Sequence, residues 1–113
     1  MDFFSKRLDM NLCRASEWLN ITYRCSYEED YQGTILHHLV RDKTIAMQNL
    51  KFPIAFLLFA GCDFYHCDDS AGNAACYLLA RRCESFTIFS QLQSIVIKLS
   101  DMFNIRINPF LYS

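Results

Sequence analysis

The sequence predicts an all-α fold made of repeated helix pairs, and three observations lead to this class. The 113-residue chain is 52% hydrophobic and 20% charged, which provides enough apolar surface for the core of a single folded domain. Apolar residues recur at helical spacing in several segments. Two successive segments, which open at Gly33 and Gly72, show the same order of turn, short helix and longer helix. The predicted parts are an N-terminal helix and connection (1–27), a first repeat (28–68), a second repeat (69–108) and an apolar tail (109–113).

The N-terminal segment predicts a helix followed by an irregular connection. The stretch "FFSKRLDMNLCRASEWLN" has one apolar stripe at helical spacing, formed by Phe4, Leu8, Leu12, Ala15, Trp18 and Leu19. We therefore expect a helix from Phe3 to Leu19, which would stand as a half-repeat before the first full repeat. The stretch "ITYRCSYEEDYQG" follows, and its β-branched and aromatic residues before an acidic turn favour a finger-like, irregular connection that ends at Gly33.

The first repeat predicts a short helix and a second helix. Thr34 is placed to cap "TILHHLVRD", because its side-chain oxygen can accept a hydrogen bond from an unpaired amide of the first turn. The following "KTIAMQNLKF" is ambiguous. Pro53 suits the first turn of the second helix, "PIAFLLFA", and Gly61 is expected to end that helix in a left-handed conformation.

The second repeat shows the same order. The stretch "DDSAG" predicts a polar turn, "NAACYLLARRC" a short helix, and "ESFTIFSQLQSIVIKLSDMF" a longer helix that Asn104 would end. One face of the longer helix is apolar and contains Phe89, Leu92, Val96, Leu99 and Phe103. Gly33 is thus matched by Gly72, and Gly61 is matched by Asn104.

The two segments resemble the ankyrin repeat, whose pattern is an acidic turn, Gly, Thr-Pro-Leu-His, a short helix, a second helix ending in Leu-Leu, and Gly-Ala-Asp. In "YQGTILHHLV" the Thr, Leu and His places are taken by Thr34, Leu36 and His37. In "FLLFAGCDF" the matching residues are Leu57, Leu58, Gly61 and Asp63, with Cys62 in the place of the small buried Ala. The stretch "DSAGNAACYLLA" opens the next repeat, so the resemblance covers residues 28 to 108.

Three features depart from the ankyrin pattern. Gly33 and Gly72 are 39 residues apart, whereas ankyrin repeats recur after about 33. Ile35 stands in the Pro place, and Cys76 and Tyr77 stand where Leu-His would be expected. The surplus of residues is expected to lengthen the connection between Lys43 and Lys51.

The resemblance implies a short ankyrin-like helix-turn-helix stack with finger loops that binds a partner protein as an adaptor, inhibitor or accessory factor. Partners of such domains contact the finger turns and the exposed side of each first helix. By position, the candidate partner-binding residues are Tyr31, Gln32, His38, Arg41, Tyr65, His66, Asp68, Tyr77 and Arg81. Tyr and Arg are the residue types that often dominate binding energy at interfaces. His37 is expected instead to connect neighbouring turns by hydrogen bonds.

The stretch "FAGCDFYHCDDSAGN" allows a second interpretation, as a metal or thiol site centred on Cys62, His66 and Cys67. A closed zinc site needs four ligands, and only these three are local. The resemblance makes Cys62 a small buried residue, so we predict neither a metal nor another cofactor. We expect the six cysteines to be thiols. Cys83 follows two positive charges, Arg81 and Arg82, but side chains of adjacent helical residues do not face each other.

Composition and motifs exclude several function classes. No GxSxG, HExxH, P-loop or GxGxxG motif is present, so we expect no enzyme. The formal charge of -1 gives no general phosphate-binding surface, so nucleic acid is expected only within a ribonucleoprotein. The longest apolar run, Phe52 to Ala60, is too short for a membrane helix. The N-terminal "MDFFSKRLDM" does not read as a secretory signal, so an intracellular location, cytoplasmic or nuclear, is predicted.

The C-terminal edge predicts a further contact. Repeat stacks are usually closed by polar terminal repeats, whereas this chain ends with "NIRINPFLYS". Its apolar residues, predicted to contact a partner or a second copy of the chain, are Ile105, Ile107, Phe110, Leu111 and Tyr112. The alternative function is therefore a permanently bound subunit of a larger assembly, such as a ribonucleoprotein or a respiratory complex.

Overall fold

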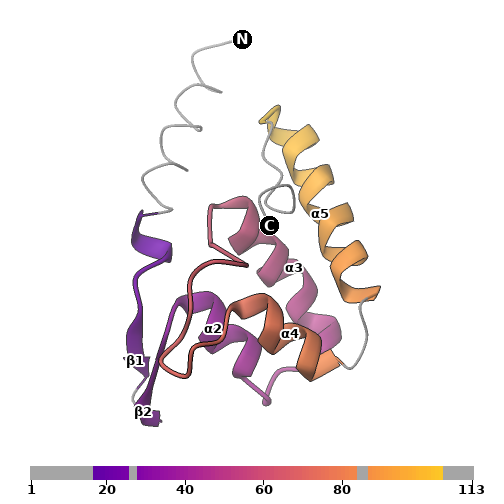
Figure 1. Ribbon diagram of the computed structural model, residues 1–113. Coiled ribbons are helices and arrows are strands. Elements are labelled where there is room, and N and C mark those ends of the chain that lie inside the picture. The colour runs from indigo at the N-terminus through magenta and orange to yellow at the C-terminus, as the bar shows by residue number, and fades with distance from the viewer. Residues whose placement is uncertain (1–16, 26–27, 84–86, 106–113) are drawn as a thin grey trace.

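The computed structural model describes residues 17–25, 28–83 and 87–105, which form helices and a small sheet (Figure 1). The elements in order are β1 (Tyr23–Cys25), β2 (Glu28–Gly33), α2 (Ile35–Arg41), α3 (Met47–Phe59), α4 (Ala75–Cys83) and α5 (Thr87–Phe103). Residues 17–19 are helical, and the rest of the N-terminal helix predicted from Phe3 lies outside the described residues.

The all-α prediction is wrong, because β1 and β2 form an antiparallel sheet where an irregular connection was expected. Tyr23 pairs with Gly33 and Arg24 with Gln32, and the register shifts between Arg24 and Cys25. β-branched and aromatic residues favour extended backbone, but two short strands alone are marginal in water. Here the sheet is supported from α2, since the His38 ring nitrogen Nε2 hydrogen-bonds to the Tyr23 carbonyl at 2.9 Å. The fold is therefore mixed α/β.

The start of α2 confirms the predicted cap. Thr34 has extended backbone and its side chain accepts a hydrogen bond from the His37 amide, while the His37 side chain accepts one from the Thr34 amide. This reciprocal arrangement satisfies two amides that a helix start would otherwise leave unpaired. It requires close approach at Gly33, where an added Cβ would lie 2.8 Å from the Cβ of His37.

The start of α3 differs from the prediction, because the helix begins at Met47 and Pro53 lies inside it. Proline removes one helical hydrogen bond and disfavours a helix interior by about 3 kcal/mol. Burial offsets this cost. Leu50, Ile54 and Leu58 form a stripe at helical spacing that is fully buried, and it continues across Pro53, which is exposed to solvent. The stretch before Pro53, which was ambiguous in the sequence, is thus helical because the folded domain buries its apolar side.

The ends of α3 and α5 confirm the prediction that Gly61 and Asn104 terminate these helices. Both have positive φ, 112° at Gly61 and 55° at Asn104. Each helix closes with the same pair of amide-to-carbonyl bonds, Gly61 to Leu58 and Cys62 to Leu57 in α3, and Asn104 to Asp101 and Ile105 to Ser100 in α5. The residue that follows each turn is buried, Cys62 in one case and Ile105 in the other.

The chain has two successive helix pairs, α2 with α3 and α4 with α5. The first helices of the pairs, α2 and α4, lie side by side, and so do the second helices, α3 and α5 (Figure 1). α4 begins 40 residues after α2 (75 against 35), and α5 begins 40 residues after α3 (87 against 47). The two matched glycines differ in conformation, because Gly72 has a φ of 82° whereas Gly33 is the last residue of β2 and has no positive φ. The helices rather than the glycines therefore define the spacing.

The core lies between the helix pairs. Its fully buried large side chains include Leu36, Val40, Leu50, Ile54, Leu58, Phe64, Leu79, Leu92 and Val96. A smaller cluster joins Phe59, Leu99 and Ile105 at the ends of α3 and α5. Asn20 connects the segment before β1 to the loop after α3, since its side chain donates to the Gly61 carbonyl and accepts from the Asp63 amide. Within the part of the chain that the structure describes, no helix has the length and apolar character needed to cross a membrane.

Candidate partner-binding surface

The two predicted fingers lie side by side and are joined by hydrogen bonds. The hydroxyl of Tyr31 in β2 donates to Asp69 Oδ2 at 2.5 Å. The Ser70 amide donates to the Gln32 carbonyl at 2.7 Å, and the Gln32 amide donates to Ser70 Oγ at 2.9 Å. These three bonds connect residues far apart in sequence, so β2 and the turn before α4 form one surface.

Asp69 holds this turn together. It is buried, and its Oδ1 accepts hydrogen bonds from the amides of Ala71 and Asn73, each at 2.9 Å. Burial by itself would raise the pKa of the carboxyl, but the hydrogen bonds from Tyr31, Asn73 and Ala71 bring that pKa below its usual value. Burial and the Asp69 carboxylate together raise the pKa of Tyr31. Asp69 is thus a stabilising residue of the finger turn.

Three predicted residues, Tyr31, His38 and Arg41, come together on α2 and β2. The His38 ring lies edge-on to Tyr31 with centroids 5.5 Å apart, and the Arg41 guanidinium carbon lies 3.5 Å above the Tyr31 ring. Tyr23, which the sequence did not single out, completes the group, with its ring centroid 4.5 Å from that of His38. The sequence could have indicated Tyr23 only through a correct prediction of the strand register, which pairs Tyr23 with Gly33.

Tyr77 and Arg81 extend this surface onto α4. They are four residues apart on the solvent side of the helix, and Tyr77 is 51% exposed. Helices α2 and α4 run parallel, because His37 meets Asn73 at their amino ends and Arg82 reaches Val40 at their carboxyl ends. We call the resulting surface the α2–α4 face, and it consists of Tyr23, Tyr31, Ile35, His38, Arg41, Tyr77 and Arg81.

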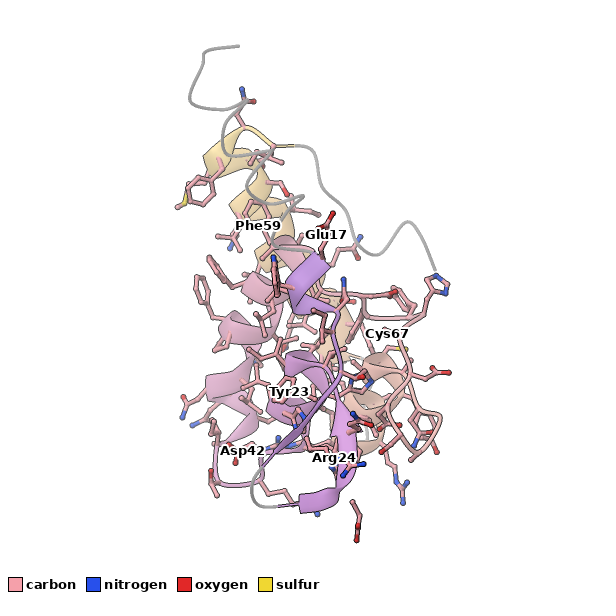
Figure 2. The ribbon with its side chains drawn as sticks, turned by 90° about the vertical axis from the view of Figure 1, so that its left-hand side faces the viewer. Glu17, Tyr23, Arg24, Asp42, Phe59 and Cys67 are labelled. Atoms are coloured by element: carbon pink, nitrogen blue, oxygen red, sulfur yellow. The ribbon has the colours of Figure 1, made fainter. Side chains whose placement is uncertain are left out.

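The remaining finger candidates, Tyr65, His66 and Asp68, lie on the loop that follows α3. Asp63 Oδ1 shapes this loop by accepting from the amides of Tyr65 and His66, each at 2.9 Å. Tyr65 is half-buried against Phe64, and burial, with Cys76 nearby, raises its pKa. His66 and Asp68 are exposed. Figure 2 shows Cys67 of this loop separate from Tyr23 and Arg24 of β1.

His37 performs the connecting role predicted for it. Its ring is fully buried, and its Nδ1 accepts from the Thr34 amide at 3.1 Å. Because a backbone amide can only donate, Nδ1 is unprotonated and Nε2 carries the proton, which it donates to the Asn73 carbonyl at 2.9 Å. His37 therefore links the start of α2 to the turn before α4 and is not available to a partner.

Arg82 has a role that the sequence did not suggest. Its Nη1 donates to the carbonyls of Val40 and Asp42 at 2.6 and 2.9 Å, and its Nη2 donates to the carbonyl of Ile45 at 2.6 Å. The last carbonyls of a helix lack intrahelical donors, so the guanidinium completes the end of α2. The carbonyls at the end of any helix need donors, but the residue that supplies them to α2 depends on how α4 packs against α2.

Cys62 and Cys67 lie on the loop that follows α3, and Cys83 is the last residue of α4. Cys62 is buried, its thiol donates to the Leu19 carbonyl at 3.9 Å, and burial, with Cys67 and Asp63 nearby, raises its pKa to about 12. The Cys67 thiol donates to the Asn20 carbonyl at 3.7 Å, and its pKa is also raised by burial. Burial outweighs Arg82 and Lys51 at Cys83, whose pKa is raised too. Among residues 17–25, 28–83 and 87–105, no three His, Cys, Asp or Glu side chains form a group that could hold a metal ion.

The predicted C-terminal contact is described only at its first residue. Ile105 is buried against Phe59 and Leu99 of its own chain, and the other four predicted residues lie outside the described part. No protein-family model matches this chain, and searches of curated proteins and of solved structures also found no match. The surface chemistry of the α2–α4 face is therefore the basis for a functional hypothesis.

Proposed function

We propose that this protein is a non-enzymatic interaction domain that binds a partner protein through the α2–α4 face, as an adaptor, inhibitor or accessory factor. The observation that carries the proposal is the grouping of three tyrosines and two arginines on that face, with Tyr77 half-exposed. Tyr and Arg are enriched among the residues whose truncation costs most binding energy. Such a grouping on the solvent side of two packed helices fits a protein interface.

The face is also held in one arrangement before any partner arrives. Tyr31 is fixed by its bond to Asp69 and by the Arg41 guanidinium above its ring. His38 is fixed by its bond to the Tyr23 carbonyl. Ordering side chains on binding costs about 0.5–1.5 kcal/mol for each one immobilised, so side chains that are already fixed lower this cost.

A divergent ankyrin-like repeat domain, with the β1–β2 sheet as its first finger, is the family that we propose. The support is local. The His37 ring bonds to the Thr34 amide at the start of α2 and to the Asn73 carbonyl in the turn before α4. The first helices of the two pairs, α2 and α4, pack together, and so do the second helices, α3 and α5. The 40-residue spacing of the helices, against about 33 in ankyrin repeats, marks the divergence.

The experiment compares two exposed aromatic residues on different helices. Tyr77→Ala removes an aromatic side chain from the α2–α4 face, and Phe52→Ala removes one from α3 that is similarly exposed, at 57%. Each tagged variant is used to capture proteins from the cells that naturally produce this chain. We expect the partner held by the unmodified protein to be lost with Tyr77→Ala and retained with Phe52→Ala. Equal recovery with both variants, each folded by circular dichroism, would refute the proposed face.

A second candidate function, a permanently bound subunit of a larger assembly, is favoured by one observation. Helices α3 and α5 expose large apolar side chains, among them Phe52, Phe56 and Met102. The rings of Phe52 and Phe56 stack with centroids 6.4 Å apart and remain about half exposed. Sizing the native species distinguishes the functions, because a subunit is recovered only in a large complex of fixed stoichiometry, whereas an adaptor is also recovered free.

A further inference from the structure

The second helices of the two pairs expose large apolar side chains and little charge. Helix α3 contains one charged residue, Lys51, which is half-buried close to Cys83 of α4. Helix α5 contains two, Lys98 and Asp101, and both are exposed. Exposed apolar side chains that lie close together often mark a contact with another protein. The outer side of α5 and the adjoining part of α3 therefore form a candidate contact surface.

Four exposed residues form a compact patch on the outer side of α5, and we call them the α5 patch: Ile97, Lys98, Asp101 and Met102. Each member lies three or four residues from another, a spacing that makes side chains neighbours on a helix. Met102 is 71% exposed and Ile97 46%. Figure 1 shows α5 at the edge of the molecule opposite β1. The side chains of Lys98 and Asp101 form no hydrogen bond or ion pair within residues 17–25, 28–83 and 87–105, so both charges are open to another molecule.

The order of residues in the α5 patch is chemically symmetric. From either end an apolar residue is followed by a charged one, because Ile97 and Lys98 mirror Met102 and Asp101. When two copies of α5 pack antiparallel about a two-fold axis midway between residues 98 and 101, Lys98 of each copy lies opposite Asp101 of the other. A parallel pairing would instead bring like charges together. A two-fold interface uses the same surface on both copies, so it requires self-complementarity of this kind.

The apolar surface continues from the α5 patch onto α3. Ile95 packs against the small cluster in which the ends of α3 and α5 meet, and Met102 lies seven residues after Ile95, on the same side of α5. Phe52 lies seven residues before Phe59 of that cluster and is 57% exposed, so it flanks the same helix contact from α3. Phe56 stacks on Phe52 and also remains about half exposed. A molecule that covers the α5 patch would therefore meet further apolar surface on the side of α3.

We propose that two copies of this protein form a two-fold symmetric dimer through the α5 patch, with α5 antiparallel to α5 and Lys98 of each copy paired with Asp101 of the other. Exposed ion pairs contribute little affinity, so they fix the orientation of the copies. The affinity comes from burying Ile97, Met102 and the exposed phenylalanines of α3. The α2–α4 face takes no part in this contact, so the inference goes beyond the proposed function, and a dimer would present two such faces.

The test measures dimerisation of the whole chain by sedimentation equilibrium, and circular dichroism verifies that each variant is folded. Lys98→Asp and Asp101→Lys each place like charges opposite one another at both symmetric contacts. A mixture of these two variants restores opposite charges at both contacts of a mixed dimer, which a fluorescent label on one variant reports. The matched control is Lys43→Asp, the same charge change at an exposed position after α2, used alone and mixed with Asp101→Lys.

We expect the unmodified protein to dimerise with a Kd of about 1–100 μM, because the apolar surface is small. Lys98→Asp and Asp101→Lys should each raise this Kd at least about tenfold, since the repulsion occurs twice in a two-fold dimer, whereas Lys43→Asp leaves it unchanged. The mixture of Lys98→Asp with Asp101→Lys should dimerise about as tightly as the unmodified protein, and the control mixture should stay weaker. A monomer at concentrations up to about 1 mM, an unchanged Kd in both single variants, or equal dimerisation of the two mixtures would overturn the inference.

One further variant separates this dimer from the proposed function. Tyr77→Ala changes the α2–α4 face and is expected to leave the dimer Kd unchanged. An increase in Kd as large as that caused by Lys98→Asp would show that the copies meet through the α2–α4 face, and would overturn the inference.

Discussion

Replacing Arg82 with alanine tests how the two helix pairs are held together. The substitution removes the guanidinium that donates to the carbonyls of Val40, Asp42 and Ile45. All three carbonyls lie at or just after the end of α2, and Arg82 lies on α4. The variant therefore affects the contact between first helices and leaves the apolar core unchanged.

The expected loss is a substantial part of the stability of a small domain. A hydrogen bond to a charged group contributes about 1.5–3 kcal/mol, but the three carbonyls lie in partly buried surroundings where water can replace part of the lost bonding. We therefore expect Arg82→Ala to lower the free energy of unfolding by about 2–4 kcal/mol, against a total of about 5–15 kcal/mol. Arg82→Lys should lose about half as much, because a single ammonium group cannot reach three carbonyls in a fixed plane.

Urea denaturation followed by far-ultraviolet circular dichroism measures this loss. With a denaturant slope of about 2 kcal/mol/M, Arg82→Ala should lower the urea midpoint by about 1–2 M. Arg81→Ala is the matched control, since Arg81 is the preceding residue and is exposed, and its effect should stay within about 0.5 kcal/mol. The reasoning is refuted if Arg82→Ala and Arg81→Ala have the same midpoint.

Three further predictions concern single residues. Gly33→Ala should lower the melting temperature more than Gly72→Ala, because a Cβ at Gly33 would lie 2.8 Å from the Cβ of His37. A Cβ at Gly72 would meet no atom within 4 Å, so only the φ of 82° disfavours alanine there. A larger fall in melting temperature for Gly72→Ala, measured by thermal unfolding, would contradict this prediction. The thiol of Cys62, with a pKa of about 12 in the folded protein, should react with iodoacetamide at about pH 8 roughly a thousandfold more slowly than the same thiol in urea-unfolded protein. The two rates are measured by mass spectrometry, and similar rates would contradict the burial of Cys62. The pKa of Asp69 is lower in the folded protein than in the unfolded chain, so its stabilisation is present above about pH 4 and is lost as the pH falls through the folded pKa. The difference in urea midpoint between the unmodified protein and Asp69→Asn should therefore be large near neutral pH and shrink at about pH 3, and a constant difference would contradict the lowered pKa.

Features that depend on a local backbone requirement were predicted correctly. The cap at Thr34 follows from unpaired amides within one turn, and the helix ends at Gly61 and Asn104 follow from the need for positive φ. The hydrogen-bonding role of His37 was expected from the ankyrin resemblance, and the structure supplies its two partners. In each case the same few neighbouring residues determine the conformation.

Features that depend on distant contacts were missed. The β1–β2 sheet is too short to be stable alone, and its support comes from His38 on one side and Ser70 on the other. Pro53 is inside α3 because the buried residues on both sides of it outweigh the preference of proline for the first turn. The three bonds of Arg82 exist only once α4 packs on α2.

The candidate site shows the same division. Tyr31, His38 and Arg41 were named from their positions in a finger and on a helix, but the stacking among them and the contribution of Tyr23 require the folded arrangement. Asp69 belongs to the stretch "DDSAG", for which the sequence predicted a polar turn. Its burial and three hydrogen bonds show that it stabilises the finger turn.

The most direct test of the central claim is site-specific photo-cross-linking in the cells that make this protein. A photoreactive amino acid replaces Tyr77 on the α2–α4 face in one variant and Phe52 on α3 in another, two positions of similar exposure. We predict that position 77 cross-links to a partner protein and that position 52 does not cross-link to the same partner. Cross-linking of that partner from position 52 alone would show that it binds the second helices instead, and would contradict the α2–α4 face as the binding surface.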